Sequence, residues 1–189
     1  GDIDIMLLHH PAANDTAAYT AIERAVRDGK VRTAGISCYY IRETDSFLPK
    51  VSVKPALIQN EIHPFYQDSP VVRHIKSLPE NIAVQAWYPL GHGDKALLQE
   101  SIFTKLGEKY HKSNAQIILR WHLQAGNIVI PGSKNPDHIR ANCDLFDFEL
   151  TGEEMERIGA LDRNKRYYTS TPAMLKKYAE MVPPVDEQK

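Results

Sequence analysis

The strongest constraint on the fold is a repeated alternation of a short apolar run, a turn and a longer amphipathic run. The apolar runs are Ile3–Leu8, Val31–Ser37, Ala56–Asn60, Ile82–Trp87 and Asn127–Pro131. They are nearly continuous, which is typical of parallel strands that are buried on both faces. Alternation of such strands with helices predicts a parallel α/β sheet with right-handed crossovers.

Helix boundaries between these runs are marked by capping signals. An apolar stripe within residues 16–28 precedes Gly29, where a left-handed C-cap is expected, and consists of Tyr19, Ile22, Ala25 and Val26. Ser113 with Gln116, and Thr151 with Glu154, form capping-box patterns. The first of these helices should run to about Gln124, with Ala115, Ile118 and Leu119 inward. Asn135-Pro136 provides an N-cap and a first-turn proline. Charged residues along the helices are interpreted as solvated outer faces.

Two architectures fit this alternation, a doubly wound nucleotide-binding sheet and a closed barrel. No G-x-G-x-x-G follows any of the strands, which counts against the first. A complete barrel has eight strand–helix units and about 250 residues. We therefore predict an incomplete parallel (β/α) barrel of TIM type, with about five of the eight units. Residues 1–189 are expected to form a single domain, with three units absent from its front.

Composition excludes several classes of function. The net charge of −1 gives no electrostatic basis for binding nucleic acid or an anionic membrane. No apolar run approaches the roughly 20 residues that span a bilayer. The start of the chain does not read as a signal peptide, so a cytoplasmic location is expected. Cys38 and Cys143 are far apart in the sequence, which argues against a disulfide framework.

Distinctive motifs follow the strands, where barrels of this kind place their functional residues. They are Leu8-His9-His10-Pro11, Gly35-Ile36-Ser37-Cys38, Gln59-Asn60-Glu61-Ile62-His63-Pro64-Phe65, Ala86-Trp87-Tyr88-Pro89-Leu90-Gly91, Ile130-Pro131-Gly132-Ser133 and, near the end, Leu161-Asp162-Arg163-Asn164. In this order, and across almost the whole chain, the motifs resemble the aldo-keto reductase pattern, from the fourth barrel strand onward.

The resemblance implies hydride transfer from a nicotinamide cofactor to a small-molecule carbonyl substrate, an aldehyde or a ketone. His9 matches the family's histidine that orients and polarises the carbonyl, which a neutral imidazole does by donating a hydrogen bond. Taken alone, His9 reads equally well as a satisfied strand-end histidine. His10 occupies a position that lines the substrate pocket.

The resemblance also implies a set of cofactor contacts. Ser37 and Gln59 match positions that hold the carboxamide, and Trp87 matches the aromatic residue that stacks on the nicotinamide ring. The alternative for Trp87 is a plain core residue. The remaining expected cofactor-binding residues are Tyr88, Leu90, Ser133, His138 and Asn142.

Three positions depart from the family pattern. Cys38 replaces an asparagine and removes one amide hydrogen bond to the carboxamide. Gly132 replaces a lysine, and His138 replaces an arginine, at the adenosine end, so fixed positive charge is lost there. Ser133, Asn135 and Asn142 remain, and the backbone amides at the helix start still favour an anion, so we expect NADP as the cofactor, with NAD as the alternative.

The family's proton-donating tyrosine, with its lysine and aspartate, belongs to the first three barrel units. We therefore expect residues 1–189 to be inactive alone. The alternative is a non-catalytic, truncated barrel that binds a nucleotide or a partner. An isomerase or aldolase barrel is disfavoured, because no lysine ends a strand. No metal site is expected, since His9, His10 and His63 lack zinc-ligand spacing. Open barrel edges predict self-association, and residues 165–189 resemble the family's substrate-loop tail.

Overall fold

The computed structural model describes residues 3–181, which fall into two compact units. Unit 1 contains residues 3–56 and 169–181 of this range, and unit 2 contains residues 57–168. The expected single domain over residues 1–189 stays a prediction. Residues 182–189 of the predicted tail lie outside the described residues.

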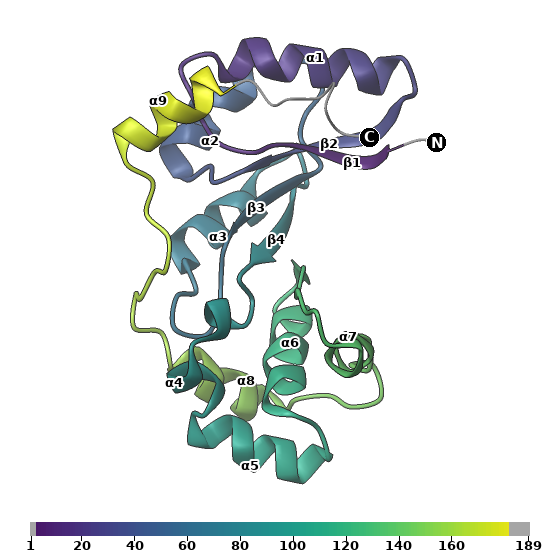
Figure 1. The fold of residues 1–189 in the computed structure, drawn as a ribbon, viewed down its shortest axis with the longest axis vertical. Helices are drawn as coiled ribbons and strands as arrows, with labels where there is room; N and C mark the ends of the chain where they lie inside the picture. Colours follow the sequence, from purple (N-terminus) through teal and green to yellow (C-terminus); the bar gives the residue numbers. More distant parts are fainter. Residues whose placement is uncertain (1–2, 182–189) are drawn as a thin grey trace. The chain divides into compact units, whose positions relative to one another are not determined.

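Unit 1 is built on a parallel pair of strands (Figure 1). Its elements are β1 (Ile3–Leu8), α1 (Asp15–Arg27), β2 (Val31–Ser37), α2 (Ile41–Phe47), a 3-10 turn (Leu48–Lys50) and α9 (Pro172–Glu180). The register runs from Ile3 opposite Val31 to Leu8 opposite Ile36. Helix α1 lies alongside both strands (Figure 1), as expected for a strand–helix–strand crossover.

The core of unit 1 contains a cluster of three aromatic rings. Tyr19 of α1 and Phe47 of α2 are buried, with ring centroids 5.1 Å apart in an edge-on contact. Tyr39 meets Phe47 at 5.0 Å in the same manner. The predicted stripe of α1 is confirmed at Tyr19 and Ile22, whereas Ala25 and Val26 are half-buried.

Two expectations for unit 1 are wrong. Strand β1 is not buried on both faces, since Ile3, Ile5 and Met6 are 50%, 44% and 41% exposed. Within the described part of unit 1, β1 pairs only with β2 and is an edge strand. Charged helix residues are not all solvated either. The Glu23 carboxylate is buried because it accepts hydrogen bonds from the backbone N–H groups of Ser52 (2.7 Å) and Val53 (2.8 Å).

Unit 2 contains three parallel strands in the order β3-β4-β5. Its elements are β3 (Leu57–Glu61), α3 (Ser69–Ser77), β4 (Ala83–Trp87), a 3-10 turn (Gly91–Gly93), α4 (Lys95–Leu98), α5 (Ser101–Tyr110), α6 (Asn114–Gln124), β5 (Asn127–Val129), α7 (Pro136–Cys143) and α8 (Gly152–Gly159). Gln59 lies opposite Gln85, and Glu61 lies opposite Trp87. Strand bounds differ from those predicted by one or two residues, which is the usual uncertainty of an element end.

A large apolar core in unit 2 is built mainly from residues of α4, α5, α6 and α8. Its buried members are Phe65, Leu97, Ile102, Phe103, Leu106, Ile117, Ile118, Trp121, Leu150 and Ile158. Both predicted capping boxes are confirmed, Ser113 with Gln116 at α6 and Thr151 with Glu154 at α8. The Asn135 cap of α7 is confirmed as well.

Candidate functional site

His9 and Ser37 lie at the same edge of unit 1. His9 follows Leu8 at the end of β1, and Ser37 is the last residue of β2. Because Leu8 and Ile36 are register partners, both residues leave the parallel pair at its carboxyl edge. His9 is exposed, whereas Ser37 is buried with its Oγ 3.7 Å from Cys38 Sγ.

The rings of His9 and His10 are in tilted contact, and His10 lies next to the last described helix. Their centroids are 4.3 Å apart, and His10 stacks on Tyr178 of α9 at 4.2 Å with the planes only 6° from parallel. A cavity of about 260 Å³ lies here, lined in part by His9, His10 and Tyr178. Burial, with His9 nearby, lowers the pKa of His10 to about 4, so at neutral pH this side chain is an uncharged wall.

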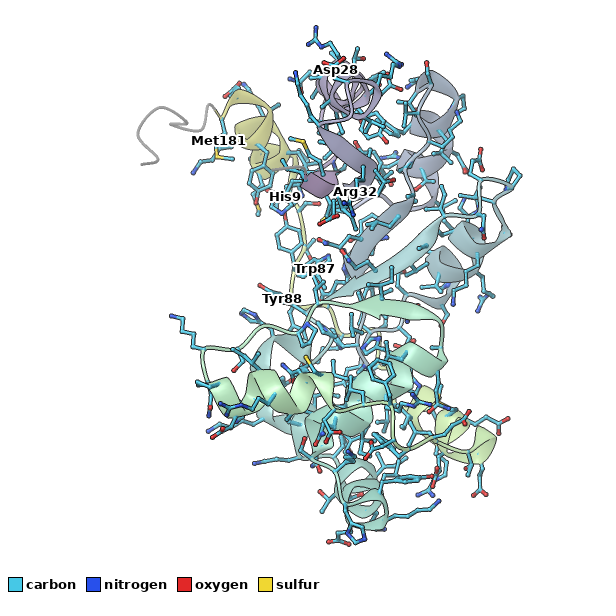
Figure 2. All side chains as sticks on the ribbon, turned by 90° about the vertical axis from the view of Figure 1, so that its right-hand side faces the viewer. His9, Asp28, Arg32, Trp87, Tyr88 and Met181 are labelled. Atoms are coloured by element: carbon cyan, nitrogen blue, oxygen red, sulfur yellow. The ribbon has the colours of Figure 1, made fainter. Side chains whose placement is uncertain are left out.

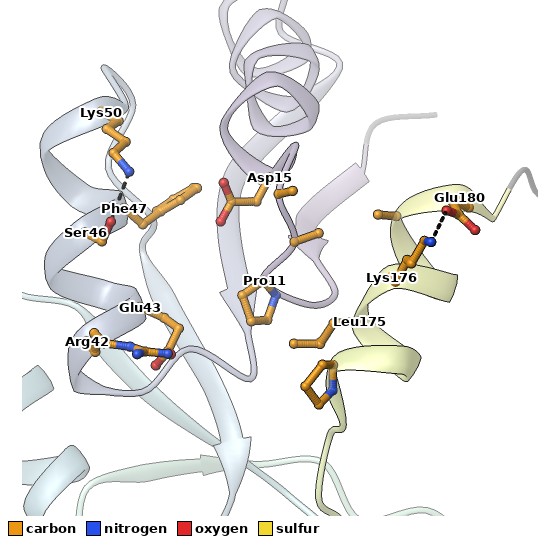
Figure 3. A pocket seen from close by; sticks show the side chains of 14 residues that line it. Pro11, Asp15, Arg42, Glu43, Ser46, Phe47, Lys50, Leu175, Lys176 and Glu180 are labelled. Carbon is orange, nitrogen blue, oxygen red and sulfur yellow. Dashed lines mark hydrogen bonds and ion pairs between the residues drawn. The ribbon is translucent and has the colours of Figure 1, made fainter.

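A larger cavity of about 760 Å³ opens between α2, the loop before α1 and α9 (Figure 3). Its charged groups are engaged locally, since Arg42 bonds Glu43, Lys50 bonds Ser46, and Lys176 lies 3.9 Å from Glu180. None of the predicted site residues is among its lining residues.

In unit 2 the predicted cofactor residues Gln59 and Trp87 stand on adjacent strands. Gln59 Nε2 donates a 2.6 Å hydrogen bond to Gln85 Oε1, its register partner on β4. This bond orients the Gln59 amide across the sheet. Trp87, two residues after Gln85, ends the neighbouring strand.

Trp87 is surrounded by aromatic rings. Tyr88, which lies beside it in Figure 2, meets it edge-on at 4.4 Å. Tyr168 meets it edge-on at 5.5 Å. The indole Nε1 is buried and has no hydrogen-bond partner among the described residues. Tyr88 adopts a left-handed backbone with φ of 51° and packs on His92, with centroids 4.2 Å apart. Leu90 follows, half-buried against the unit 2 core.

The three residues predicted at the adenosine end follow β5. Ser133 Oγ accepts a hydrogen bond from the Asn135 backbone at 3.1 Å, just before α7 begins. His138 is exposed on α7, and Asn142 is half-buried and lines a cavity of about 530 Å³.

Glu61 was missed by the sequence analysis as a site residue. It is completely buried at the end of β3. Its carboxylate accepts hydrogen bonds from the backbone N–H groups of Tyr167 (2.6 Å) and Tyr168 (3.1 Å), and His63 Nε2 lies 3.2 Å from Oε1. One sequence signal was available, a glutamate at the end of an apolar strand. Carboxylates are rarely buried unless they are paired, so this position indicates a buried partner for Glu61.

His122 was missed too. It is completely buried, and its Nε2 lies 3.1 Å from the Pro89 carbonyl, in the loop that follows Trp87. Burial lowers the pKa of His122 to about 3, only partly offset by that hydrogen bond, so the ring is neutral and donates from Nε2. No sequence signal distinguishes His122, because a histidine on an apolar helix is expected to be an ordinary core residue.

Two features are absent from residues 3–181. No group of three or more His, Cys, Asp or Glu side chains in this range is arranged to hold a metal ion. None of the helices in the described range is both long and apolar enough to cross a membrane.

His9, Ser37 and Trp87 stand at the carboxyl ends of parallel strands, and Gln59 lies in the middle of β3, so these polar and aromatic groups belong to an α/β arrangement. The model of the aldo/keto reductase family matches residues 2–163. The chain belongs to the aldo/keto reductase family. This membership and the strand–helix alternation confirm the predicted α/β class, a parallel barrel with about five of its eight units.

Several curated relatives are similar over most of the chain. Glyoxal reductase of Bacillus subtilis is 36% identical over 167 residues, which are 87% of this chain and 58% of the relative. Methylglyoxal reductase DkgA of Yersinia pestis is 34% identical over 87% of this chain and 60% of its own length. The chain therefore spans about three fifths of the length of these relatives.

Solved structures give the same result. An aldo-keto reductase from a Medee basin deep-sea metagenome matches with a TM-score of 0.83 and 31% identity, over 89% of this chain and 62% of that one. The Bombyx mori aldo-keto reductase in complex with NADP matches with a TM-score of 0.81 and 30% identity, over 89% and 60%.

Proposed function

We propose that this chain forms the cofactor face and the carbonyl-orienting part of an NAD(P)H-dependent reductase of small aldehydes or ketones. The observation that carries the proposal is Trp87, an aromatic residue that ends β4 with part of its side chain exposed, one strand away from the amide of Gln59. Aromatic faces stack favourably on planar rings, so this residue is suited to contact a nicotinamide. Two relatives are named glyoxal reductase and methylglyoxal reductase, so glyoxal and methylglyoxal are suitable probe compounds.

Within this proposal the nicotinamide, when bound, supplies the hydride. In unit 2, the half-buried Trp87 offers its ring face and Gln59 offers a side-chain hydrogen bond to the carboxamide. In unit 1, Ser37 offers a hydroxyl group at the end of β2. Tyr88 and Leu90 extend this contact surface along the loop after β4. At the adenosine end, Ser133, His138 and Asn142 offer polar contacts without a fixed charge, because Gly132 stands where a lysine is common.

On the carbonyl side, His9 donates a hydrogen bond to the carbonyl oxygen and stabilises the charge that develops there. Its exposure leaves the ring accessible to a substrate. The neutral His10 forms one wall beside it. Held against Tyr178, His10 limits the size of the carbonyl compound that reaches His9.

The proton donor is not supplied by Tyr39, a tyrosine close to the predicted site in the sequence. Its hydroxyl is directed to Asp15 Oδ2 at 3.0 Å. Burial and the Asp15 carboxylate raise the pKa of Tyr39 far above its usual value, which makes it a poor acid at neutral pH. We therefore expect residues 1–189 to bind the cofactor without reducing a carbonyl by themselves.

The test is a titration of the chain with NADPH and with NADH, followed by cofactor fluorescence. We expect saturable binding that prefers NADPH, and a dissociation constant about tenfold weaker for Trp87→Ala, which is the order of one lost aromatic contact. His74→Ala is the control, because His74 is a half-buried ring on α3 of the same unit and is outside the proposed cofactor residues. Absence of binding by the folded wild type would refute the proposal. NADH preference would reassign the cofactor.

We also propose that the chain associates with a second copy of itself through β1. Ile3, Ile5 and Met6 expose apolar surface beside an unpaired strand edge, and such edges pair with other chains. A monomer by sedimentation, with a cooperative melt, is the result that contradicts this proposal.

A further inference from the structure

The buried carboxylate of Glu61 holds a segment that comes from far along the chain. Residues 163–168, the return segment, follow α8 and run back to the end of β3. Both carboxylate oxygens are used, Oε1 by Tyr167 N and by His63 Nε2, and Oε2 by Tyr168 N. His63 Nδ1 has no partner among the described residues, so the proton of a neutral ring belongs on Nε2, where it is donated to Glu61.

The return segment is attached a second time at its beginning. The backbone N–H groups of Arg163 and Lys165 both donate to the Phe65 carbonyl, at 3.1 and 3.0 Å. Further along, the Tyr167 hydroxyl donates to Asp94 Oδ2. The position of the segment is therefore maintained by several contacts, and Glu61 is the one that fixes its last two residues.

The last of these residues meets the proposed cofactor residue. The Tyr168 ring lies 5.5 Å from Trp87 at an angle of 74°. Trp87 is also the register partner of Glu61 across β3 and β4. The carboxylate is thus connected to Trp87 through the backbone of Tyr168, whose ring contacts the indole, while the pairing of β3 with β4 places Glu61 beside Trp87.

Anchoring alone does not require a charge. Burying a carboxylate costs several kcal/mol unless it is fully hydrogen-bonded, and what it provides here is two acceptor oxygens for two adjacent N–H donors. A glutamine of the same shape would keep one acceptor and turn an amide NH₂ toward the other donor. The two-acceptor geometry therefore specifies where Tyr168 sits.

We propose that Glu61 is a positioning residue of the cofactor site, which sets the orientation of the Trp87 ring through the backbone of Tyr167 and Tyr168. The inference rests on the proposed function, because it assigns to Trp87 the contact with the nicotinamide. Glu61 touches neither cofactor nor substrate in this role.

The experiment uses the whole chain with three variants. Glu61→Gln releases one N–H of the return segment, and Tyr168→Leu removes the ring but keeps the backbone contacts. Asp94→Asn is the matched control, since it weakens the return segment at Tyr167 while asparagine still caps α4. Two quantities are measured, the dissociation constant for NADPH and the NMR resonance of the Trp87 indole N–H in the free protein. Trp121 provides an internal reference resonance.

We expect Glu61→Gln and Tyr168→Leu to shift the Trp87 resonance, leave that of Trp121 in place and weaken NADPH binding by about tenfold, the order of one lost aromatic contact. Asp94→Asn should change neither quantity. A Glu61→Gln protein that melts lower but keeps the Trp87 resonance and the NADPH affinity would make Glu61 a structural anchor only and overturn the proposal.

If Glu61→Gln fails to fold, Tyr168→Leu decides, and an unchanged resonance and affinity in that variant overturn the proposal. If the wild type binds no dinucleotide, the proposed function fails separately. The Trp87 resonance, measured without cofactor, still determines whether Glu61 positions the ring.

Discussion

The two units hold their strand-end residues by different means. In unit 1, His9, His10 and Tyr178 meet through ring faces, with centroids 4.2–4.3 Å apart. In unit 2, the loop after β4 and the return segment are held by hydrogen bonds to the buried side chains of Glu61 and His122. Ring contacts have broad energy minima, whereas hydrogen bonds lose strength steeply with angle.

The difference matches the task proposed for each unit. A residue that contacts a planar nicotinamide must present one ring face in one orientation, which directional hydrogen bonds can maintain. A wall such as His10 needs only to occupy space, and a stacked ring does this while it can adapt to different carbonyl compounds. The comparison predicts that unit 2 tolerates less change near its site than unit 1.

The largest expected effect is at Gly91, in the turn after β4. Gly91 has φ of 65°, and an added Cβ would lie 2.5 Å from Leu97 Cδ2, a side chain buried in the core. Gly91→Ala should destabilise unit 2 by about 2–4 kcal/mol, the sum of a left-handed alanine and overpacking. Both tryptophans, Trp87 and Trp121, lie in unit 2, so urea unfolding followed by tryptophan fluorescence measures this change.

Gly29→Ala is the matched variant in unit 1. Gly29 has φ of 70°, but nothing lies within 4 Å of an added Cβ. Only the backbone penalty of about 1 kcal/mol is expected in the free energy of unfolding, which urea unfolding followed by circular dichroism measures. Equal costs at the two glycines would contradict the difference in packing between the units.

The sequence predicted the fold class because its apolar periodicity and its capping boxes are local signals. The capping box of α8 is one example, because Thr151 and Glu154 are only three residues apart and together mark where this helix begins. Glu61 could not be paired in the same way, because its partners Tyr167 and Tyr168 lie more than a hundred residues away. Nor could the sequence show that β1 is exposed, since burial depends on which elements cover a strand.

A smaller effect is expected at Glu154, which ties α8 to α5. Burial alone would raise its pKa, but hydrogen bonds from Lys109, Tyr110 and the Thr151 backbone lower the pKa to about 2. A depressed carboxyl pKa stabilises the fold above about 4.5 and loses this contribution as the pH falls toward 2. Glu154→Gln should cost about 1–2 kcal/mol at pH 7 and flatten the acid dependence of unit 2 unfolding. Glu153→Gln, at an exposed position of the same helix, should leave both unchanged.

The smallest effect is expected at His10 and reports on unit 1. The pKa of His10 falls from 6.5 to about 4 because its burial and His9 disfavour the charged ring. A histidine with a depressed pKa favours the fold at neutral pH, and this contribution is lost as the pH falls from 6.5 to about 4. Since the ring is partly exposed, solvent screening limits the loss to about 1 kcal/mol or less.

His10→Phe keeps a ring against Tyr178 but cannot titrate, so it should remove this pH dependence. The readout is hydrogen exchange of the β2 amides, corrected for the intrinsic effect of pH. His138→Phe, on the exposed face of α7 in unit 2, is the control. Because the His10 window lies mostly above that of Glu154, acidification should loosen unit 1 before unit 2. Simultaneous loss of protection in both units would mean that the ring contacts and the carboxylate contacts do not act independently.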